Sequence, residues 1–308
     1  MNVIEQPAEL RAAGRPVCAA IGVFDGVHLG HRQVLQQALD AAAQHEGIPI
    51  AVTFDDHPAR VLAPERAPRM IYPLAKKLAL LESLGFRDVL LIRFTPEFAA
   101  IAADEFIARL VAGFGRLREI SVGSEFTFGH RRSGNVALLH QLGARHGFVV
   151  NDLAAVALDS ERVSSTRIRA AITAGELAAA AQMLGRAHTL NGKVVRGDQL
   201  GRQLGFPTAN LEVTNLALPP NGVYAAHAHL ENGSHRAAVN VGLRPTLNEP
   251  APRLHVEAHL PGFTGDLYDR PLELQCVQRL RGEMKFANLE ELRSQISRDV
   301  AEVEQAFT

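Results

Sequence analysis

Ile21-Gly-Val-Phe-Asp-Gly-Val-His-Leu-Gly-His31 is the segment that decides the fold of the first half of this chain. It overlaps an apolar run, Val17 to Phe24, that is typical of a buried strand, and it leads into a long helical pattern. A strand that turns directly into a helix aims unpaired N–H groups and a positive dipole end at one spot. Because His28 and His31 stand at that spot, the segment indicates a polyphosphate site.

The rest of the first 185 residues alternates short apolar runs with helical patterns. This alternation predicts an α/β domain with a doubly wound parallel sheet and helices on both faces. Ligands bind such sheets outside the carboxyl ends of the strands, which is where Asp25 to His31 falls. The expected strands are Val17–Phe24, Ile48–Phe54, Val89–Phe94, Glu119–Val122 and Phe148–Leu153, and the expected helices are His31–Glu46, Leu74–Leu84, Asp104–Ala112 and Asn135–His146.

The pattern changes near residue 186, so we place one domain at residues 1–185 and a second at 186–308. Short strand-like runs separated by Gly, Pro and Asn predict a small closed β-barrel there. Glu231-Asn-Gly-Ser234 is a hairpin signal, and Asn288 with Glu291 forms a capping-box pattern for a C-terminal helix. That helix carries an apolar stripe predicted to lie on the barrel, made of Leu289, Leu292, Ile296, Val300, Val303 and Phe307.

Composition narrows the class of protein. The 308 residues, 47% hydrophobic and 21% charged, suit a two-domain globular chain, and a net charge of −1 argues against nucleic-acid binding. We expect no signal peptide and no membrane span, because no apolar run approaches roughly 18 residues. Cys18 and Cys276 are expected to be buried free thiols, which fits a cytoplasmic location. The oligomeric state is left open, a monomer included.

A second segment, Val163-Ser-Ser-Thr-Arg-Ile-Arg169, completes the proposed phosphate site. A Ser-Ser-Thr turn that opens a helix offers hydroxyl and N–H donors, and Arg169 adds a charged fork. Taken alone, the segment would fit a plain helix cap with exposed arginines. Together the two segments predict that phosphate contacts come from Gly22, Phe24, Asp25, Gly26, His28, Gly30, His31, Ser164, Ser165, Thr166 and Arg169.

The predicted barrel has its own motif, Gly192-Lys-Val-Val-Arg-Gly197 followed by Gly201-Arg-Gln-Leu-Gly-Phe-Pro-Thr-Ala-Asn-Leu211. Its glycines let backbone approach a polyphosphate. The Thr208 hydroxyl and the Asn210 carbonyl oxygen are hard ligands suited to a Mg²⁺ ion that bridges ATP phosphates. The motif therefore predicts a second ATP site.

The segment Gly22 to His31 resembles the signature of nucleotidyltransferases that carry His-x-Gly-His. Together, the motifs of both domains resemble more narrowly those of the bacterial bifunctional riboflavin kinase/FAD synthetase family. The resemblance implies an N-terminal FMN adenylyltransferase (FAD synthetase) domain and a C-terminal riboflavin kinase domain. It implies ATP, riboflavin and FMN as substrates, Mg²⁺ as cofactor and FAD as final product. It also implies that His28 and His31 are catalytic and that Glu257 is the kinase base. Strand alternation places His255, Glu257 and His259 on one face.

The same resemblance implies further contacts in the kinase domain. Asn240-Val-Gly-Leu-Arg-Pro-Thr246 is also similar to the family, and Arg298 is expected on the flavin side with Glu257. Two segments depart from the family pattern: Asp269 stands where glycine is usual, and Ala187-His188 stands where proline and an aromatic are usual. The expected ATP contacts are Gly192, Val195, Gly197, Arg202, Gly205, Phe206, Pro207, Thr208 and Asn210, with Thr208 and Asn210 as metal ligands.

Two segments of the first domain are similar to flavin-site elements of the family, Thr53-Phe-Asp-Asp-His-Pro58 and Val122-Gly-Ser-Glu-Phe-Thr-Phe-Gly129. Asp56 replaces a usual proline and Glu125 a shorter polar residue, so the phenylalanines could equally be plain core residues. This leaves open a riboflavin kinase with a weakened or non-catalytic nucleotidyltransferase domain, or a nucleotidyltransferase with another acceptor. The expected flavin contacts are Phe54, His57, Pro58, Glu125, Phe126 and Phe128.

Overall fold

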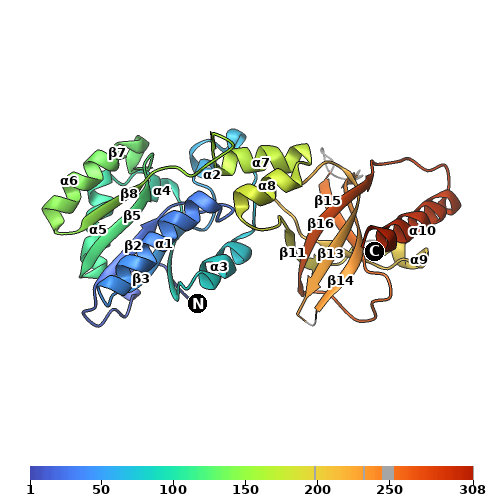
Figure 1. Ribbon diagram of the computed structural model, residues 1–308, viewed down its shortest axis with the longest axis horizontal. Helices are drawn as coiled ribbons and strands as arrows, with labels where there is room; N and C mark the ends of the chain where they lie inside the picture. The colour runs from blue at the N-terminus through green and yellow to red at the C-terminus, as the bar shows by residue number, and fades with distance from the viewer. Residues whose placement is uncertain (198, 232, 245–252, 308) are drawn as a thin grey trace. The chain divides into compact units, whose positions relative to one another are not determined.

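A computed structural model describes residues 1–197, 199–231, 233–244 and 253–307. The chain divides into two compact units, an α/β unit and a β-barrel unit (Figure 1). The first unit comprises residues 1–168 with 183–185, and the second comprises 169–182 with 186–308. The predicted boundary at residue 185 coincides with the end of the first unit, while residues 169–182 are counted with the second.

Six parallel strands form the sheet of the first unit, in the order β1-β4-β3-β2-β5-β8. This confirms the predicted doubly wound parallel sheet. The chain moves outward from β2 in one direction through β3 and β4, and then returns to β5 on the other side of β2. The topological switch point, where such folds bind ligands, therefore lies at the end of β2. The strands are β1 Asn2–Ile4, β2 Val17–Ile21, β3 Ile48–Phe54, β4 Asp88–Ile92, β5 Leu117–Gly123 and β8 Val149–Leu153.

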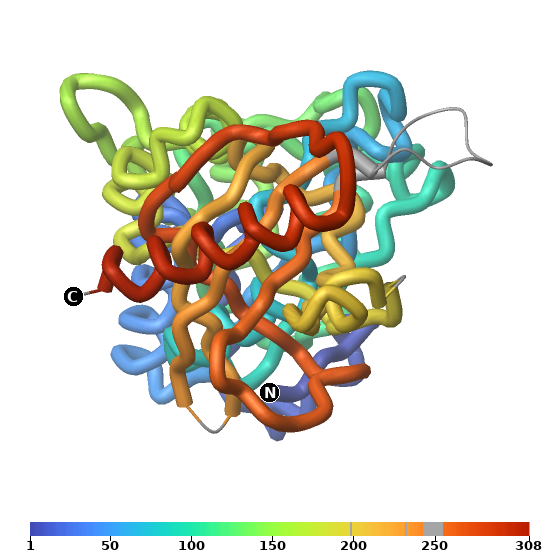
Figure 2. Tube along the Cα trace, turned by 90° about the vertical axis from the view of Figure 1, so that its right-hand side faces the viewer, coloured from blue at the N-terminus to red at the C-terminus, as the bar shows by residue number. Residues whose placement is uncertain are grey.

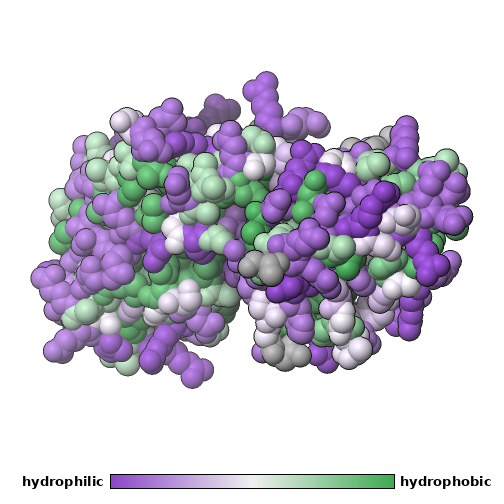
Figure 3. All heavy atoms as spheres, turned by 45° about the vertical axis from the view of Figure 1, so that its right-hand side comes forward, coloured by the Kyte–Doolittle hydropathy of each residue, from purple (hydrophilic) through white to green (hydrophobic). Residues whose placement is uncertain are grey.

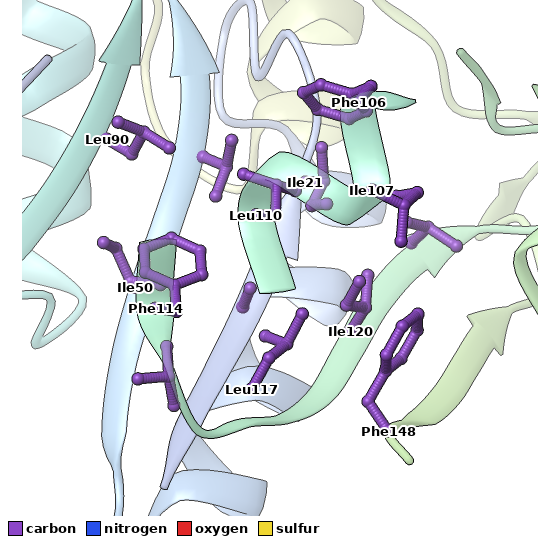
Figure 4. Close-up of a cluster of buried hydrophobic side chains, with 14 of the residues drawn as sticks. Ile21, Ile50, Leu90, Phe106, Ile107, Leu110, Phe114, Leu117, Ile120 and Phe148 are labelled. Carbon is purple, nitrogen blue, oxygen red and sulfur yellow. The ribbon is translucent and has the colours of Figure 1, made fainter. Parts of the chain in front are cut away.

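Helices cover both faces of this sheet because residues of β2 alternate between two apolar clusters. Val17, Ala19 and Ile21 pack with α5 and α6, whereas Ala20 packs with α1 and α3 (Figure 4 shows the first cluster). The helices are α1 Leu29–Gln44, α2 Ala59–Leu62, α3 Leu74–Ser83, α4 Pro96–Ala99, α5 Ala103–Phe114, α6 Val136–His146, α7 Ser165–Ala174 and α8 Leu177–Leu184. The remaining short strands are β6 Thr127–Phe128, β7 Gly134–Asn135, β9 Ala157–Leu158 and β10 Glu161–Arg162.

The second unit contains a closed barrel in the order β11-β12-β15-β14-β13-β16, as predicted. Leu230 pairs with Gly233, so the expected hairpin joins β13 to β14, although Asn232 lies outside the described residues. Pro245 and Thr246 of the family-like segment lie outside them as well. The strands are β11 Leu190–Val195, β12 Thr208–Leu211, β13 Gly222–Leu230, β14 Gly233–Arg244, β15 Arg253–His259 and β16 Pro271–Arg281, with the short helix α9 Leu200–Gln203.

The C-terminal helix α10, Leu289–Ala306, crosses the outside of the barrel (Figure 2). Asn288 caps it as predicted, since its Oδ1 accepts the Glu291 N–H at 2.9 Å. The predicted apolar stripe is partly wrong, because Leu289 is exposed while Gln295 and Asp299 are buried. Asp299 forms a bidentate ion pair with Arg281 of β16, so the buried face of α10 carries polar residues beside the predicted Val303.

The surface agrees with a globular chain of balanced charge. Hydrophilic side chains are spread over the visible face of both units (Figure 3). Cys18 and Cys276 are free and buried, as predicted. Among the residues that the structure describes, no helix is both long and apolar enough to cross a membrane.

Candidate active sites

The loop that follows β2 is strained. β2 ends at Ile21, earlier than predicted, because Phe24 has a φ of 51° and Val27 a φ of 42°. Positive φ angles at such residues cost about 1–3 kcal/mol each, so the surrounding contacts must hold this loop. Gly26 has a φ of 82°, and a Cβ there would lie 2.8 Å from Ile71 Cδ1. The Phe24 ring lies over Gly22, 2.8 Å from the position of a Cβ.

His28 begins α1 and lies against His31. Its Nδ1 accepts the His31 backbone N–H at 3.3 Å, which makes His28 the N-cap. The two imidazole rings stack with centroids 3.6 Å apart, and a Cβ at Gly30 would be 3.3 Å from His28 Cε1. The structure therefore brings both histidines together at the first turn of a long helix, where N–H groups and the dipole favour an anion.

The Ser-Ser-Thr segment meets this loop. The Ser165 hydroxyl donates a hydrogen bond to the Asp25 carbonyl at 2.9 Å, across 140 residues of sequence. Ser164 acts as a cap, since its Oγ accepts the Arg167 N–H at 3.2 Å, and Thr166 lies in the first turn of α7. Arg169 is counted with the second unit, so its place beside the histidines stays a prediction.

Two buried charged residues support the loop from the protein interior. The Asp25 carboxylate, 2% exposed, accepts the Ile71 N–H at 3.0 Å. Lys77 of α3 is also 2% exposed, and its Nζ donates to carbonyl oxygens of the β2 loop and of β3. Sequence reasoning missed Lys77, because a lysine on an amphipathic helix is normally solvated and no spacing distinguishes this one.

A row of aromatic rings joins the two predicted flavin segments. Phe54 contacts Phe98 with centroids 6.2 Å apart, Phe98 contacts Phe106 at 5.8 Å, and Phe106 contacts Phe128 at 6.3 Å. Phe126 then stacks on Phe128 at 5.4 Å. The structure thus gathers the predicted phenylalanines into one cluster, with Phe98 and Phe106 as members that the motifs did not indicate.

A cavity of about 680 Å³ adjoins this row, between β4, α4, α5 and residues 5–8. Asp55, Phe98 and Phe106 line it, together with aliphatic residues of β4. Its volume lies in the range of small-molecule sites, and its walls are mainly apolar, as is usual for such sites. None of the six predicted flavin residues lines it directly, although Asp55 follows Phe54 in the chain.

Asp56 and Glu125, the two departures from the family pattern in the first domain, both have local partners. Asp56 accepts the His57 N–H at 2.7 Å and pairs with Arg60 at 2.9 Å, so it stabilises the turn where a proline is usual. His57 in turn accepts the Ala59 N–H, and Pro58 precedes α2. Glu125 forms an ion pair with Arg162, next to the Ser-Ser-Thr segment.

In the second unit, the predicted kinase residues share one row on the barrel. Register pairs Val195 with Asn210, Asn210 with Glu257, and Glu257 with Asn240 across β11, β12, β15 and β14. The neighbouring Val256 and Ala258 are fully buried, so Glu257 lies on the opposite face of β15, as the alternation predicted, and that face is the outer one. A carboxylate and an amide from neighbouring strands therefore stand side by side.

The glycine-rich segment packs against this row. A Cβ at Gly197 would lie 2.5 Å from Asn210 Nδ2, so Gly197 leaves the space that the Asn210 side chain occupies. A Cβ at Gly192 or at Gly201 would instead meet a backbone carbonyl of this unit at 2.5 Å. These two glycines therefore serve close packing of the chain on itself.

A cavity of about 400 Å³ opens beside β12 and is lined by the predicted residues Arg202, Pro207 and Thr208. His259 Nδ1 donates to the Pro207 carbonyl at 2.8 Å, and the Phe206 ring contacts His259. Gly205, with a φ of 90°, precedes Phe206. The cavity is also lined by a segment that the motifs did not indicate, which includes Phe263, Asp266, Leu267 and Tyr268.

Neither Asp269 nor Arg298 lines this cavity, although Asp269 directly follows the lining residue Tyr268. Asp269 has a φ of 63°, which explains the glycine usual there, and its ion pair with Lys193 at 2.7 Å lowers the pKa of the Asp269 carboxyl. Arg298 is exposed on α10, which packs on β13, β14 and β16, whereas Glu257 belongs to β15. Its expected flavin contact stays a prediction.

The first unit thus has the parallel sheet and switch point expected of a nucleotidyltransferase, with the predicted phosphate-binding segment at that point. The second combines a closed barrel with oxygen ligands and a carboxylate suited to phosphoryl transfer. Family models support both assignments: FAD synthetase matches residues 11–167, and riboflavin kinase matches residues 184–307.

Curated relatives cover nearly the whole chain. A bifunctional riboflavin kinase/FMN adenylyltransferase from Pseudomonas fluorescens is 38% identical, over 98% of this chain and 96% of the relative. One from Escherichia coli K12 is 36% identical, over 97% and 96%. A crystal structure described as the macrolide-efflux protein of Streptococcus pneumoniae is 26% identical with a TM-score of 0.81, over 98% of both chains. The chain belongs to the bifunctional riboflavin kinase/FMN adenylyltransferase family and is an enzyme with both domains.

Proposed function

We propose that the two domains act in succession on one flavin, each through the residues described above. The barrel phosphorylates the 5′-hydroxyl of riboflavin with ATP, and the α/β domain transfers AMP from a second ATP to the resulting FMN, giving FAD and pyrophosphate. The observation that carries this proposal is that each unit gathers its own motif: His28 stacks on His31 at the first turn of α1, and Asn210 stands opposite Glu257 in the barrel.

In adenylyl transfer, an oxygen of the FMN phosphate attacks the α-phosphorus of ATP, and the bond to the pyrophosphate oxygen breaks. The FMN phosphate is already an anionic nucleophile, so this step needs no base. His28, His31 and the first turn of α1 would hold the α-phosphate and stabilise charge as pyrophosphate leaves. The Ser165–Asp25 hydrogen bond supports this assignment, since it joins the second motif to the same loop.

In the kinase step, the 5′-hydroxyl oxygen attacks the γ-phosphorus and ADP leaves. Glu257 would accept the hydroxyl proton, while Thr208 and Asn210 would hold Mg²⁺ together with the ATP phosphates. The donor set fits this ion, because Thr208 and Asn210 lie two residues apart on the same face of β12 and Glu257 pairs with Asn210 in register. When bound there, Mg²⁺ would neutralise charge on the transferred phosphoryl group.

The aromatic row from Phe54 to Phe126 is our candidate for the flavin ring site of the α/β domain. Stacked and edge-on rings beside an apolar cavity suit an isoalloxazine, and the nearby polar groups would bond its pyrimidine edge. We further propose a cytoplasmic enzyme, which the two buried free thiols support.

A single assay tests the proposal. Purified protein is incubated with riboflavin, ATP and Mg²⁺, and the products are separated by chromatography. We expect FMN followed by FAD. Absence of FMN would contradict the kinase assignment, and FMN without FAD would favour a kinase with a non-catalytic nucleotidyltransferase domain.

A further inference from the structure

A buried lysine sits under the phosphate-binding loop without belonging to any motif of this chain. Lys77 lies on α3, and its Nζ is 2.6 Å from the Phe54 carbonyl, 3.3 Å from the Val23 carbonyl and 3.4 Å from Thr53 Oγ1. An ammonium group has three N–H donors, and here three acceptors surround it. One acceptor belongs to the loop after β2, and two belong to the end of β3.

The Val23 carbonyl connects Lys77 to the loop that carries His28. It accepts from Lys77 and also from the Thr53 hydroxyl at 3.0 Å. Val23 directly precedes Phe24, the first residue of the loop with a positive φ, and His28 follows shortly after. Since the loop is strained, hydrogen bonds at its base must hold it in the form that places His28 at the start of α1.

We propose that Lys77 is a positioning residue of the adenylyltransferase, whose buried ammonium ties the loop after β2 to the end of β3 and so places the His28 and His31 rings. This inference rests on the proposed function of that loop. It adds a residue that contacts neither nucleotide nor flavin and acts through the Val23 and Phe54 carbonyls.

Lys77 is a buried cation with three carboxylates near it, and its burial costs folding free energy. Burial lowers the pKa of Lys77 to about 8, although Asp25, Asp55 and Asp56 act in the opposite direction. Asp25 belongs to the loop, and Asp55 and Asp56 follow β3. Because the pKa is lower in the folded protein than in the unfolded chain, the charge itself opposes folding at neutral pH. Replacement by methionine should therefore leave the domain folded.

The two activities of the chain provide an internal control. We expect Lys77→Met to lower kcat/KM for FAD formation from supplied FMN by about 100-fold, because small misplacements of reacting groups have effects of that size. FMN formation from riboflavin should stay within about twofold, since the barrel is untouched. Lys76→Met, which removes the neighbouring, half-buried lysine of α3, is the matched control and should retain both activities.

The pH dependence of FAD formation distinguishes a positioning role of Lys77 from a role in stability alone. A neutral amine has two N–H donors for three acceptors, so FAD formation by the unmodified enzyme should fall as pH rises through about 8. FMN formation should show no such limb, and Lys77→Met should lose it. The proposal is overturned if Lys77→Met makes FAD at the normal rate, or if the unmodified enzyme has no alkaline limb between pH 7 and 9.5. An unmodified enzyme that makes no FAD at all would instead contradict the proposed function.

Discussion

Asn210 of β12 stands directly opposite Glu257 of β15 in the antiparallel ladder of the barrel. The pairing places an amide and a carboxylate side by side on the outer face, because Ala209 and Ala258 point inward and are buried. A proposed metal ligand and a proposed base are thus held at one strand spacing by backbone hydrogen bonds. The geometry does not depend on a flexible loop.

Asn210→Ala should abolish FMN formation while FAD formation from supplied FMN continues. The substitution removes a proposed oxygen ligand for Mg²⁺ without altering the ladder, and we expect a loss of about 100-fold or more. Product chromatography with riboflavin, and separately with FMN, measures both activities. Loss of both activities in a folded protein would show that the division of labour is wrong.

His28→Ala should have the converse effect, with FAD formation reduced by about 100- to 1,000-fold and FMN formation retained. Because His28 is also the N-cap of α1, His28→Asn serves as the sharper variant. Asparagine is a good cap, so this variant keeps helix stability and removes only the imidazole. Normal FAD formation by His28→Asn would mean that His28 is a cap alone.

Gly197→Ala should lower FMN formation by about 10- to 100-fold, since its Cβ would lie 2.5 Å from Asn210 Nδ2 and displace that side chain. Gly282→Ala is the matched control in the same unit, because its Cβ would meet only Arg279 Nη2, at 3.6 Å. Initial rates with riboflavin and ATP test the difference. Equal rates for the two variants would remove Gly197 from the site.

Asp299→Ala should destabilise the barrel unit by about 3 kcal/mol, because it leaves the largely buried Arg281 guanidinium without its carboxylate. Glu302→Ala, an exposed position on the same helix, should change stability by less than about 0.5 kcal/mol. Denaturant unfolding of each variant gives these values. Similar midpoints would show that α10 is held by its apolar contacts alone.

His188 should make the protein less stable in acid. Burial, with a smaller contribution from Arg186, lowers its pKa from 6.5 to about 4. The unfolded chain therefore binds more protons between these values, so stability falls as pH decreases from about 6.5 to 4, by up to about 3 kcal/mol. His188→Phe, which restores an aromatic, should flatten this dependence relative to the unmodified protein. Parallel pH curves of the two would contradict the assignment.

Local sequence determined much of this protein. Alternating strand and helix patterns predicted the parallel sheet, and Gly, Pro and Asn spacing predicted the barrel, because both signals follow from backbone periodicity. The same periodicity placed His28 at a strand-to-helix turn and Glu257 on the strand face opposite Val256 and Ala258. Short elements such as β1 were missed, since three residues carry too little pattern.

Only the tertiary structure decided which distant groups meet. Nothing in the spacing of Ser165 and Asp25 shows that they share a hydrogen bond, and nothing in α3 marks Lys77 as buried beneath a strained loop. Asp299 is buried on α10, outside the predicted apolar stripe, because it pairs with Arg281 on a strand packed against that helix. Such contacts depend on how elements far apart in sequence pack, and burial then sets which charges are retained, paired or shifted in pKa.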